Sequence, residues 1–136
     1  MSKNLINDFI PMLICNNVEE SIAFYTANLG FEVVNYDKEI GTSGFATIEN
    51  GSIRLMMASP SFYEAPKGEI GKPLTDTIQY FYTDDVVALK QRLDENGVAS
   101  TDFKVRFYGL KEIEVQDPDG RLLIIGQDTD EPPTPE

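Results

Sequence analysis

The feature that most constrains the fold is an internal repeat, because one order of elements occurs twice along the 136 residues. Each half reads as an apolar strand, a polar helix cap, an amphipathic helix that ends at a glycine, and three further strand-like runs. Residues 17–30 align with residues 85–97 across a one-residue gap. A strand–helix–three-strand unit that occurs twice predicts an α+β fold made of two βαβββ modules.

The first half opens with an apolar run at residues 10–15. Either Asn16 or Asn17 can then cap a helix by accepting backbone N–H bonds. Apolar residues recur at helical spacing from Val18 to Leu29, and Gly30 stands where a left-handed cap would end the helix. Turn residues then separate three strand-like runs, with a strong hairpin signal at Asn50-Gly51. The runs are residues 31–36, 44–49 and 52–58.

The second half repeats this order from residue 78. Asp84 and Asp85 form a capping pair, and the helical stripe that follows ends at Gly97. The Asp-Pro-Asp-Gly run at residues 117–120 is a well-formed turn between the last two strands. The predicted strands of this half are residues 78–83, 105–109, 110–116 and 121–127.

These signals predict a first module at residues 1–58 and a second at residues 77–127. The connecting loop at 59–76 is rich in Pro, Gly and Ser and contains two aromatic residues. It is either a plain linker or a segment that covers a binding site. The acidic tail at 128–136 has three prolines and no aromatic residue, which predicts disorder.

The formal net charge is −12, and it is still −8 without the four acidic residues of the tail. An acidic surface repels phosphate backbones and anionic membranes, so we expect no nucleic-acid or membrane partner. The charge either serves solubility or attracts a cationic small molecule or a basic protein. No apolar run approaches the roughly 18 residues of a membrane span, and the first residues are too polar for a secretory signal. With the single cysteine, Cys15, this predicts a cytoplasmic protein.

The chain contains no histidine. This excludes a Ser-His-Asp or Cys-His nucleophile pair within one chain, and it excludes a histidine-ligated zinc or iron site. A general acid or base would have to be a carboxylate, lysine, tyrosine or cysteine.

Two motifs together resemble the vicinal oxygen chelate superfamily, which includes glyoxalases, bleomycin-resistance proteins and dioxygenases. Residues 11–33 combine a strand, a polar cap and a helix with Phe-Tyr that ends in Leu-Gly-Phe. Residues 108–125 combine an aromatic-Gly pair with Asp-Pro-Asp-Gly and a closing strand. The resemblance implies paired βαβββ modules whose cupped mixed sheets surround a shared cleft.

Metal enzymes of this superfamily place one ligand on each of four strands that face the cleft. Motif spacing places these positions at Ile10, Arg54, Ile78 and Ile124. Three apolar side chains and one cation cannot bind a divalent metal. The resemblance therefore implies the metal-free branch, with no metal, no cofactor and no metal-dependent glyoxalase or dioxygenase activity.

Bleomycin-resistance proteins belong to this branch, and they are acidic cytosolic dimers that sequester a cationic drug without reaction. Pro11 matches a first-strand proline that those proteins associate with exchange of the N-terminal arm, although it also suits an edge strand. Tyr108-Gly109 lies near their aromatic-Gly pair. We therefore expect a homodimer with a small-molecule ligand, and antibiotic sequestration is one form of this function.

Because strand side chains alternate between faces, the four mapped positions also predict which residues line the cleft. The result is an apolar, aromatic hollow with one charged group, which suits a flat or greasy ligand with a polar anchor. The candidate ligand-binding residues are Ile10, Met12, Arg54, Met56, Ile78, Tyr80, Tyr82, Phe107, Tyr108 and Ile124. No catalytic residue is assigned.

Several alternatives remain open at this point. Arg54 either anchors an anionic group of a ligand or pairs internally with an acid such as Glu112 or Glu114. The strand aromatics either pack within the sheet or stack on a planar ligand. One rival function is a metal-independent lyase or isomerase with Tyr80 or Glu112 as the acid–base group. Another is a regulatory or interaction module whose cleft is filled by its own side chains.

Overall fold

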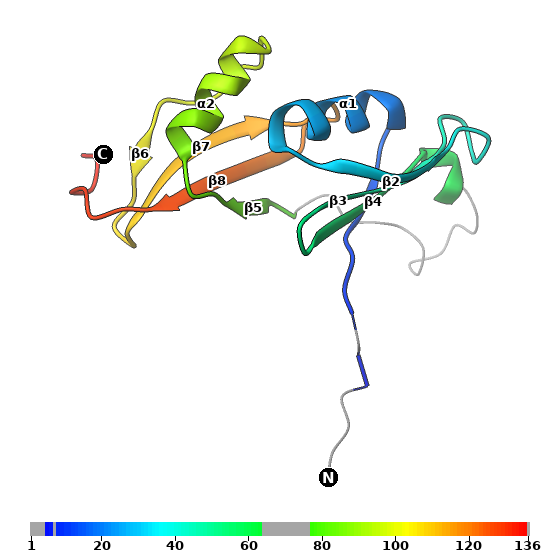
Figure 1. Cartoon of the computed structure of the whole chain (residues 1–136), viewed down its shortest axis with the longest axis horizontal. Helices are drawn as coiled ribbons and strands as arrows, with labels where there is room; N and C mark the ends of the chain where they lie inside the picture. Colours follow the sequence, from blue (N-terminus) through cyan, green and yellow to red (C-terminus); the bar gives the residue numbers. More distant parts are fainter. Residues whose placement is uncertain (1–4, 7, 64–76, 136) are drawn as a thin grey trace. The chain divides into compact units, whose positions relative to one another are not determined.

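A computed structural model of the chain describes residues 5–6, 8–63 and 77–135. These residues form two compact units. The first holds the described residues up to 63, except Ala27–Leu29, which group with residues 77–135 in the second. Each unit contains one four-stranded mixed sheet, and Figure 1 shows a helix over each sheet. The predicted α+β class with two repeated modules is confirmed.

The first unit has the strand order β1-β4-β3-β2. Strand β1 runs parallel to β4, and the other neighbours are antiparallel. Its elements are β1 (Met12–Ile14), α1 (Val18–Leu29), β2 (Glu32–Asp37), β3 (Phe45–Asn50), β4 (Ile53–Ala58) and a 3-10 turn at Pro60–Tyr63.

The second unit repeats this topology with the order β5-β8-β7-β6, in which β5 runs parallel to β8. Its elements are β5 (Gln79–Tyr82), α2 (Val86–Glu95), β6 (Lys104–Val105), β7 (Leu110–Gln116) and β8 (Leu122–Asp128). In both units the first strand lies beside the last one.

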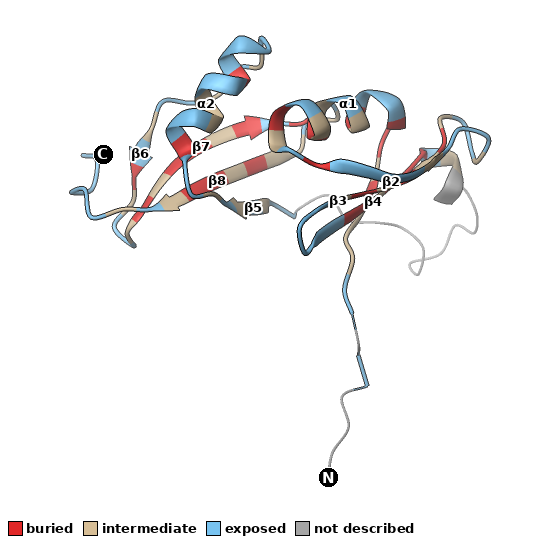
Figure 2. Ribbon diagram, in the orientation of Figure 1, coloured by how far each residue is buried: buried red, intermediate tan, exposed pale blue. Residues whose placement is uncertain are grey.

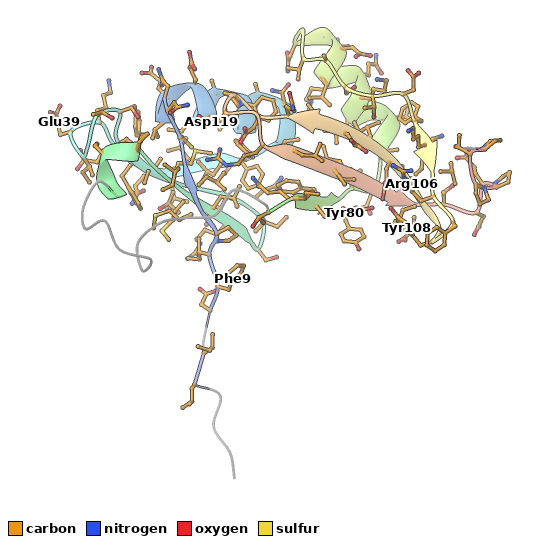
Figure 3. The ribbon with its side chains drawn as sticks, turned by 180° about the vertical axis from the view of Figure 1, so that it is seen from behind. Phe9, Glu39, Tyr80, Arg106, Tyr108 and Asp119 are labelled. Carbon is orange, nitrogen blue, oxygen red and sulfur yellow. The ribbon has the colours of Figure 1, made fainter. Side chains whose placement is uncertain are left out.

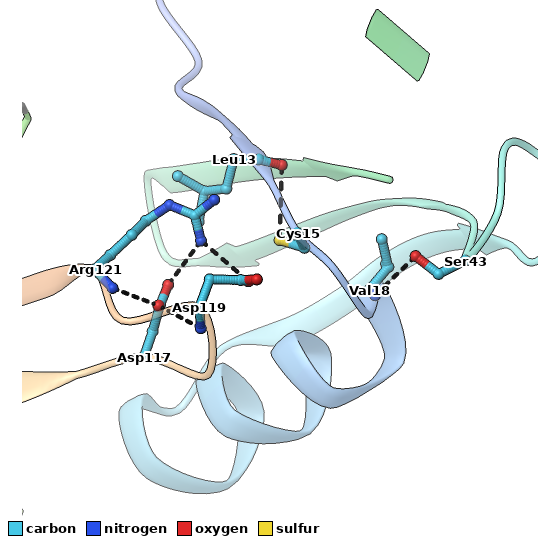
Figure 4. Close-up of polar contacts among 7 residues, drawn as sticks. All are labelled: Leu13, Cys15, Val18, Ser43, Asp117, Asp119 and Arg121. Carbon is cyan, nitrogen blue, oxygen red and sulfur yellow. Dashed lines mark hydrogen bonds and ion pairs between the residues drawn. The ribbon is translucent and has the colours of Figure 1, made fainter. Parts of the chain in front are cut away.

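Both helices begin at the type of cap that the sequence indicates. The side chain of Asn17 accepts a hydrogen bond from Glu20 N at 3.0 Å, and that of Asp85 accepts one from Ala88 N at 3.0 Å. A second oxygen serves the first turn of α1, because Ser43 Oγ accepts from Val18 N at 3.2 Å (Figure 4). Helix α1 ends at Gly30, whose φ of 76° is the left-handed conformation predicted there.

The core of each unit lies on one face of its sheet, and Figure 2 shows buried residues alternating with less buried ones along the strands. In β1 and β4 the buried residues include Leu13, Leu55 and Met57. In β7 and β8 they include Ile113, Val115, Leu123 and Ile125. Cys15 is also fully buried. The intervening residues, among them Met12, Met56 and Ile124, are half-buried on the opposite, open face.

The predicted strand at residues 105–109 is wrong over most of its length. Strand β6 ends at Val105, and the chain then turns. Gly109 N donates to Arg106 O at 3.1 Å, while Arg106 N donates to Leu110 O at 2.8 Å. Gly109 has a φ of 83°, in the left-handed region that favours glycine, and this conformation closes the turn. Phe107 and Tyr108 therefore lie in a turn.

The predicted turn at residues 117–120 is present, and its first aspartate holds it together. Gly120 N donates to Asp117 O at 2.9 Å. The Asp117 carboxylate accepts from the backbone N–H groups of Asp119 and Arg121 and from the Arg121 guanidinium, as Figure 4 shows. These bonds join β7 to β8 at a fixed register.

The C-terminal tail was expected to be disordered, and the structure differs. Strand β8 extends to Asp128, and the chain beyond it returns to the edge of the second sheet. Thr134 N donates to Val105 O at 2.9 Å. The prolines around Thr134 favour an extended backbone, which can lie beside an edge strand.

Residues 64–76, which make up most of the predicted connecting loop, lie outside the described part of the chain. Within the described ranges, none of the helices has the length and apolar character needed to cross a membrane.

Candidate ligand-binding site

The second unit carries a buried carboxylate on the open face of its sheet. Glu112 of β7 is 2% exposed, and a charge taken out of water needs compensating donors. Its Oε2 accepts hydrogen bonds from the hydroxyls of Tyr80 at 2.5 Å and Tyr108 at 2.7 Å. Its Oε1 accepts from Arg106 Nε at 3.1 Å. Three side chains from two other segments thus converge on one carboxylate.

Tyr80 can reach Glu112 only because of Gly126. Tyr80 lies on β5 and Glu112 on β7, and β8 runs between these two strands. A Cβ atom at position 126 of β8 would lie 2.5 Å from the Tyr80 hydroxyl, which is closer than real Cβ contacts come. The missing side chain of Gly126 therefore opens the path across β8.

The turn between β6 and β7 supplies the other two donors. Arg106 also forms an ion pair with Glu114, at 3.5 Å between Nη2 and Oε2. Figure 3 shows Tyr80, Arg106 and Tyr108 in the same part of the second unit. The two carboxylates and one guanidinium leave this Glu112 network with a formal charge of −1 when both tyrosines are protonated.

The network moves each pKa away from neutrality. Burial alone would raise the pKa of Glu112, but hydrogen bonds from Tyr80, Tyr108 and Arg106 outweigh it and lower that pKa below its ordinary 4.5. Burial and the bond to Glu112 raise the pKa of Tyr80, and the same bond and burial raise that of Tyr108. Near neutral pH the carboxylate is ionised and both hydroxyls keep their protons.

Four aromatic side chains, two of them members of this network, form what we call the aromatic surface. Tyr82 is 72% exposed and Phe107 is 88% exposed, so large areas of ring face solvent. The ring centroids of Tyr80 and Tyr82 are 5.1 Å apart, as are those of Phe107 and Tyr108. The aromatic surface consists of Tyr80, Tyr82, Phe107 and Tyr108.

The aromatic surface adjoins two further predicted site residues of the second unit. Ile124 of β8 is the register partner of Tyr80, and Ile78 lies directly before β5 and is 52% exposed. The structure thus brings six predicted residues onto one unit, from β5, β8 and the turn after β6.

The predicted residues of the first unit form a set of their own. Met12 and Met56 are register partners on neighbouring strands, and Ile10 lies shortly before β1. Arg54 Nε lies 3.7 Å from Glu49 Oε2, so the acid beside it is Glu49 rather than Glu112 or Glu114. Both of those acids pair with Arg106 instead.

Sequence reasoning named Tyr80, Tyr108 and Glu112 but missed Arg106 and Gly126. Arg106 was placed inside a strand, where nothing distinguishes it from other surface cations. A lone glycine in an otherwise apolar strand, as at Gly126, is a signal of close approach by another group and could have been followed.

Residues 8–125 match the model of the glyoxalase/bleomycin resistance protein/dioxygenase superfamily. The chain belongs to this superfamily. None of the curated protein sequences compared with it matches.

Solved structures of the superfamily share the fold. TioX from Micromonospora matches with a TM-score of 0.73 and 17% identity, over 90% of this chain and 98% of that one. Lactoylglutathione lyase from Agrobacterium tumefaciens matches with a TM-score of 0.70 and 17% identity, over 91% of this chain and 96% of that one. A superfamily member from Sphaerobacter thermophilus gives 0.69 and 22%, over 91% and 100%. At these identities the likeness shows the fold alone.

The metal of the superfamily's metal-dependent enzymes does not fit the residues present. Arg54 on β4 and Ile124 on β8 occupy two of the four positions mapped from the resemblance, and Ile10 and Ile78 occupy the others. Within residues 5–6, 8–63 and 77–135, no group of three or more His, Cys, Asp or Glu is placed to hold a metal ion. A guanidinium and three isoleucines offer no oxygen, nitrogen or sulfur ligand to such an ion.

Proposed function

We propose that this protein is a metal-free small-molecule-binding member of the superfamily, which holds a planar organic ligand against the aromatic surface without changing it chemically. The observation that carries this proposal is the Glu112 network. It fixes two of the four rings by hydrogen bonds, while Tyr82 and Phe107 present exposed ring faces beside them. Rings that are already fixed lose little conformational freedom when a ligand stacks on them.

Stacking supplies both affinity and shape selection. An aromatic pair contributes about 0.5–1.5 kcal/mol beyond the area that it buries, so two or three rings support binding of a flat ligand. The formal net charge of −12 favours a ligand that carries positive charge, through the field of the whole molecule. We therefore propose a planar cation, such as an antibiotic with a fused or linked ring system.

The rival acid–base enzyme has less support. A general acid or base works best with a pKa near the working pH. Glu112 is fully engaged with three donors and has a lowered pKa, whereas Tyr80 has a raised one. Neither of the two groups suggested for acid–base chemistry therefore exchanges a proton readily near neutral pH, and binding without reaction is the better-supported function.

We also propose that the protein works as a cytoplasmic homodimer, as the resemblance to bleomycin-resistance proteins implies. Light scattering in solution tests this part, since one chain has a mass of 15.2 kDa. A mass twice as large at micromolar concentration would support the dimer, and a monomer mass would count against it.

Thermal-shift measurement tests the binding proposal. Ligands that bind only the native state raise Tm. The panel would contain bleomycin, planar cationic antibiotics, the planar cation proflavine and the aromatic anion anilinonaphthalene sulfonate. We expect planar cations to raise Tm, and we expect Tyr82→Ala and Phe107→Ala to reduce the shift. Val34→Ala, at an exposed residue of β2 in the first unit, is the matched control. A panel with no effect, or shifts that persist in both aromatic variants, would refute the proposal.

A further inference from the structure

The chain beyond β8 contacts the β6–β7 hairpin on both sides of the turn that carries Arg106, Phe107 and Tyr108. Figure 1 shows the C-terminus beside β6. Thr129 N donates to Gly109 O at 3.0 Å. Residues 129–134, which we call the C-terminal segment, therefore begin at one end of the turn.

The segment reaches the other end of the turn at Val105. Thr134 N donates to Val105 O at 2.9 Å, and Val105 N donates to Thr134 Oγ1 at 2.8 Å. Strand β6 is at the edge of the sheet, where outward backbone groups lack a strand partner. Thr134 supplies both a donor and an acceptor to this edge.

A third contact holds the middle of the segment. Glu131 Oε2 lies 3.1 Å from Lys111 Nζ on β7 and accepts from Thr129 Oγ1 at 3.2 Å. Glu131 N donates in turn to Thr129 Oγ1 at 3.2 Å. Pro132 and Pro133 then fix two backbone φ angles, so the chain loses less freedom when it lies along the hairpin.

Besides the C-terminal segment, the turn is held by its own backbone hydrogen bonds and by the bonds of Arg106 and Tyr108 to Glu112. Strand β6 contributes only Lys104 and Val105. The turn itself places an 88% exposed ring, Phe107, and a 50% exposed ring, Tyr108, in contact with solvent. Segments with few buried apolar contacts open locally at low free energy. Apart from the bonds to Glu112 and the ion pair of Arg106 with Glu114, the described contacts that flank the turn are the backbone bonds of the hairpin and those of the C-terminal segment.

We propose that the C-terminal segment is a clasp that positions the Arg106–Phe107–Tyr108 turn, and thereby sets the geometry of the aromatic surface. Thr134 is the central positioning residue, because it closes the clasp at Val105. Loss of the clasp lets the turn move away from Glu112 and lowers the affinity of the aromatic surface for its ligand. That last consequence rests on the proposed function, whereas the order of the turn is measurable without a ligand.

The decisive pair of full-chain variants is Thr134→Pro and Thr134→Ser. Proline removes both the backbone donor and the side-chain acceptor, and it suits an extended chain that is already flanked by Pro133 and Pro135. Serine retains both groups. The first readout is amide hydrogen exchange by NMR, without ligand, at Val105, at Arg106 and Gly109, whose N–H groups are bonded within the turn, and, as an internal reference, at Val115 in β7.

We expect exchange at Val105 and in the turn to become roughly tenfold faster in Thr134→Pro, since two hydrogen bonds are lost. The rates at Val115 should not change, and Thr134→Ser should resemble the parent protein. Unchanged exchange in the turn of Thr134→Pro would overturn the clasp. Equal acceleration at Val115 would also overturn it, because the effect would then be general destabilisation.

The second readout is the Kd of proflavine for the parent protein and both variants. We expect weaker binding in Thr134→Pro and restored binding in Thr134→Ser. If the parent does not bind proflavine while exchange in the turn responds as expected, the clasp stands and planar-cation binding fails. If the parent binds proflavine with the same Kd in Thr134→Pro, the link from clasp to site is refuted.

Discussion

Glu112 is the residue on which the candidate site depends. A carboxylate that is 2% exposed is stable only while its three donors remain in place. Its neighbour Glu114, on the same face of β7, is about one-third exposed and has one ion partner in Arg106. The two acids therefore offer a matched comparison at nearly the same place.

Glu112→Gln should lower the free energy of unfolding by about 2–4 kcal/mol, because the charge is lost and an amide NH2 faces donors that need an acceptor. Glu114→Gln should change it by less than about 1 kcal/mol, as for an exposed ion pair. Urea unfolding of both variants checks this. Equal effects would contradict the central place of Glu112.

Acid should destabilise the protein partly through the same residue. The folded-state pKa of Glu112 lies below its ordinary 4.5, so its contribution is present above that value and is lost as the pH falls through the lower folded-state pKa. The stability difference between the parent and Glu112→Gln should therefore shrink below about pH 4.5. Urea midpoints measured across this range give the result, and a constant difference would be inconsistent with it.

At this scale the sequence allows part of the site to be predicted. Tyr80, Tyr82 and Tyr108 follow from strand alternation and from the aromatic-Gly motif. Arg106 does not, because its role depends on a turn that brings it back to Glu112. The partner of Arg54 is also beyond such reasoning, since it depends on the register of Glu49 opposite Arg54 in β3 and β4.

Local interactions stabilise the individual helices and strands, and the helix caps are the clearest of these. Asp85 accepts the backbone N–H of Ala88, whereas Asp84, the other half of the predicted capping pair, is exposed and does not cap α2. Because both side chains are aspartates, replacing each one in turn distinguishes the effect of the cap on stability from the effect of the negative charge.

Asp85→Ala should cost about 1 kcal/mol of stability, in the usual range for an N-cap. Asp84→Ala removes the same charge and should stay within about 0.5 kcal/mol of the parent. Chemical unfolding monitored by circular dichroism distinguishes the two. The reverse ranking would mean that the cap is misassigned.

Gly126 in strand β8 allows a test of whether its missing side chain lets Tyr80 reach Glu112. Gly126→Ala should cost about 1–3 kcal/mol, because the new Cβ meets the Tyr80 hydroxyl. In a Tyr80→Phe background the same change should cost less, since the hydroxyl at 2.5 Å is gone. A double-mutant cycle of unfolding free energies measures this coupling, and additive costs would argue against a path across β8.

Helices and long strands were predictable because their signals are local. Helix α1 follows from its cap, its apolar spacing and Gly30. The strand predicted at residues 105–109 was too long because several of its residues are apolar or aromatic, whereas the hydrogen bonds of Arg106 with Gly109 and Leu110 close a turn directly after Val105. The tail was misjudged because its order comes from partners at Val105 and Gly109, which lie far away in the sequence.

The whole molecule combines a repeated fold with a charge of −12 and no histidine. The repeat predicted both sheets, since each unit must bury the apolar face of a helix and a sheet. Composition limits which catalytic and metal-binding groups the chain can have, but it does not specify the fold. Neither the repeat nor the composition identifies the ligand, because under the proposed function the ligand is selected by the spacing of a few rings.

None of the four positions mapped as metal sites carries a metal-ligating side chain, and this leads to a prediction about the melting temperature of the whole protein. Neither EDTA nor Zn²⁺, Mn²⁺ or Ni²⁺ at low micromolar concentration should change Tm, because native-state metal binding would raise it. A thermal-shift titration with each ion checks this. A reproducible rise with one ion that EDTA reverses would reopen the metal-dependent enzyme.

The parallel pairing of β1 with β4 and of β5 with β8 determines when each sheet can be completed during synthesis. The first strand of each unit can pair only after the last strand of that unit has been synthesised. All the strands of the first sheet have been made once residue 58 is translated. The second sheet, by contrast, has no neighbour for β5 until β8 leaves the ribosome. A nascent chain arrested before Leu122 would therefore carry a complete first sheet and expose Tyr80 and Tyr82 on an unpaired strand, which a folding chaperone could bind.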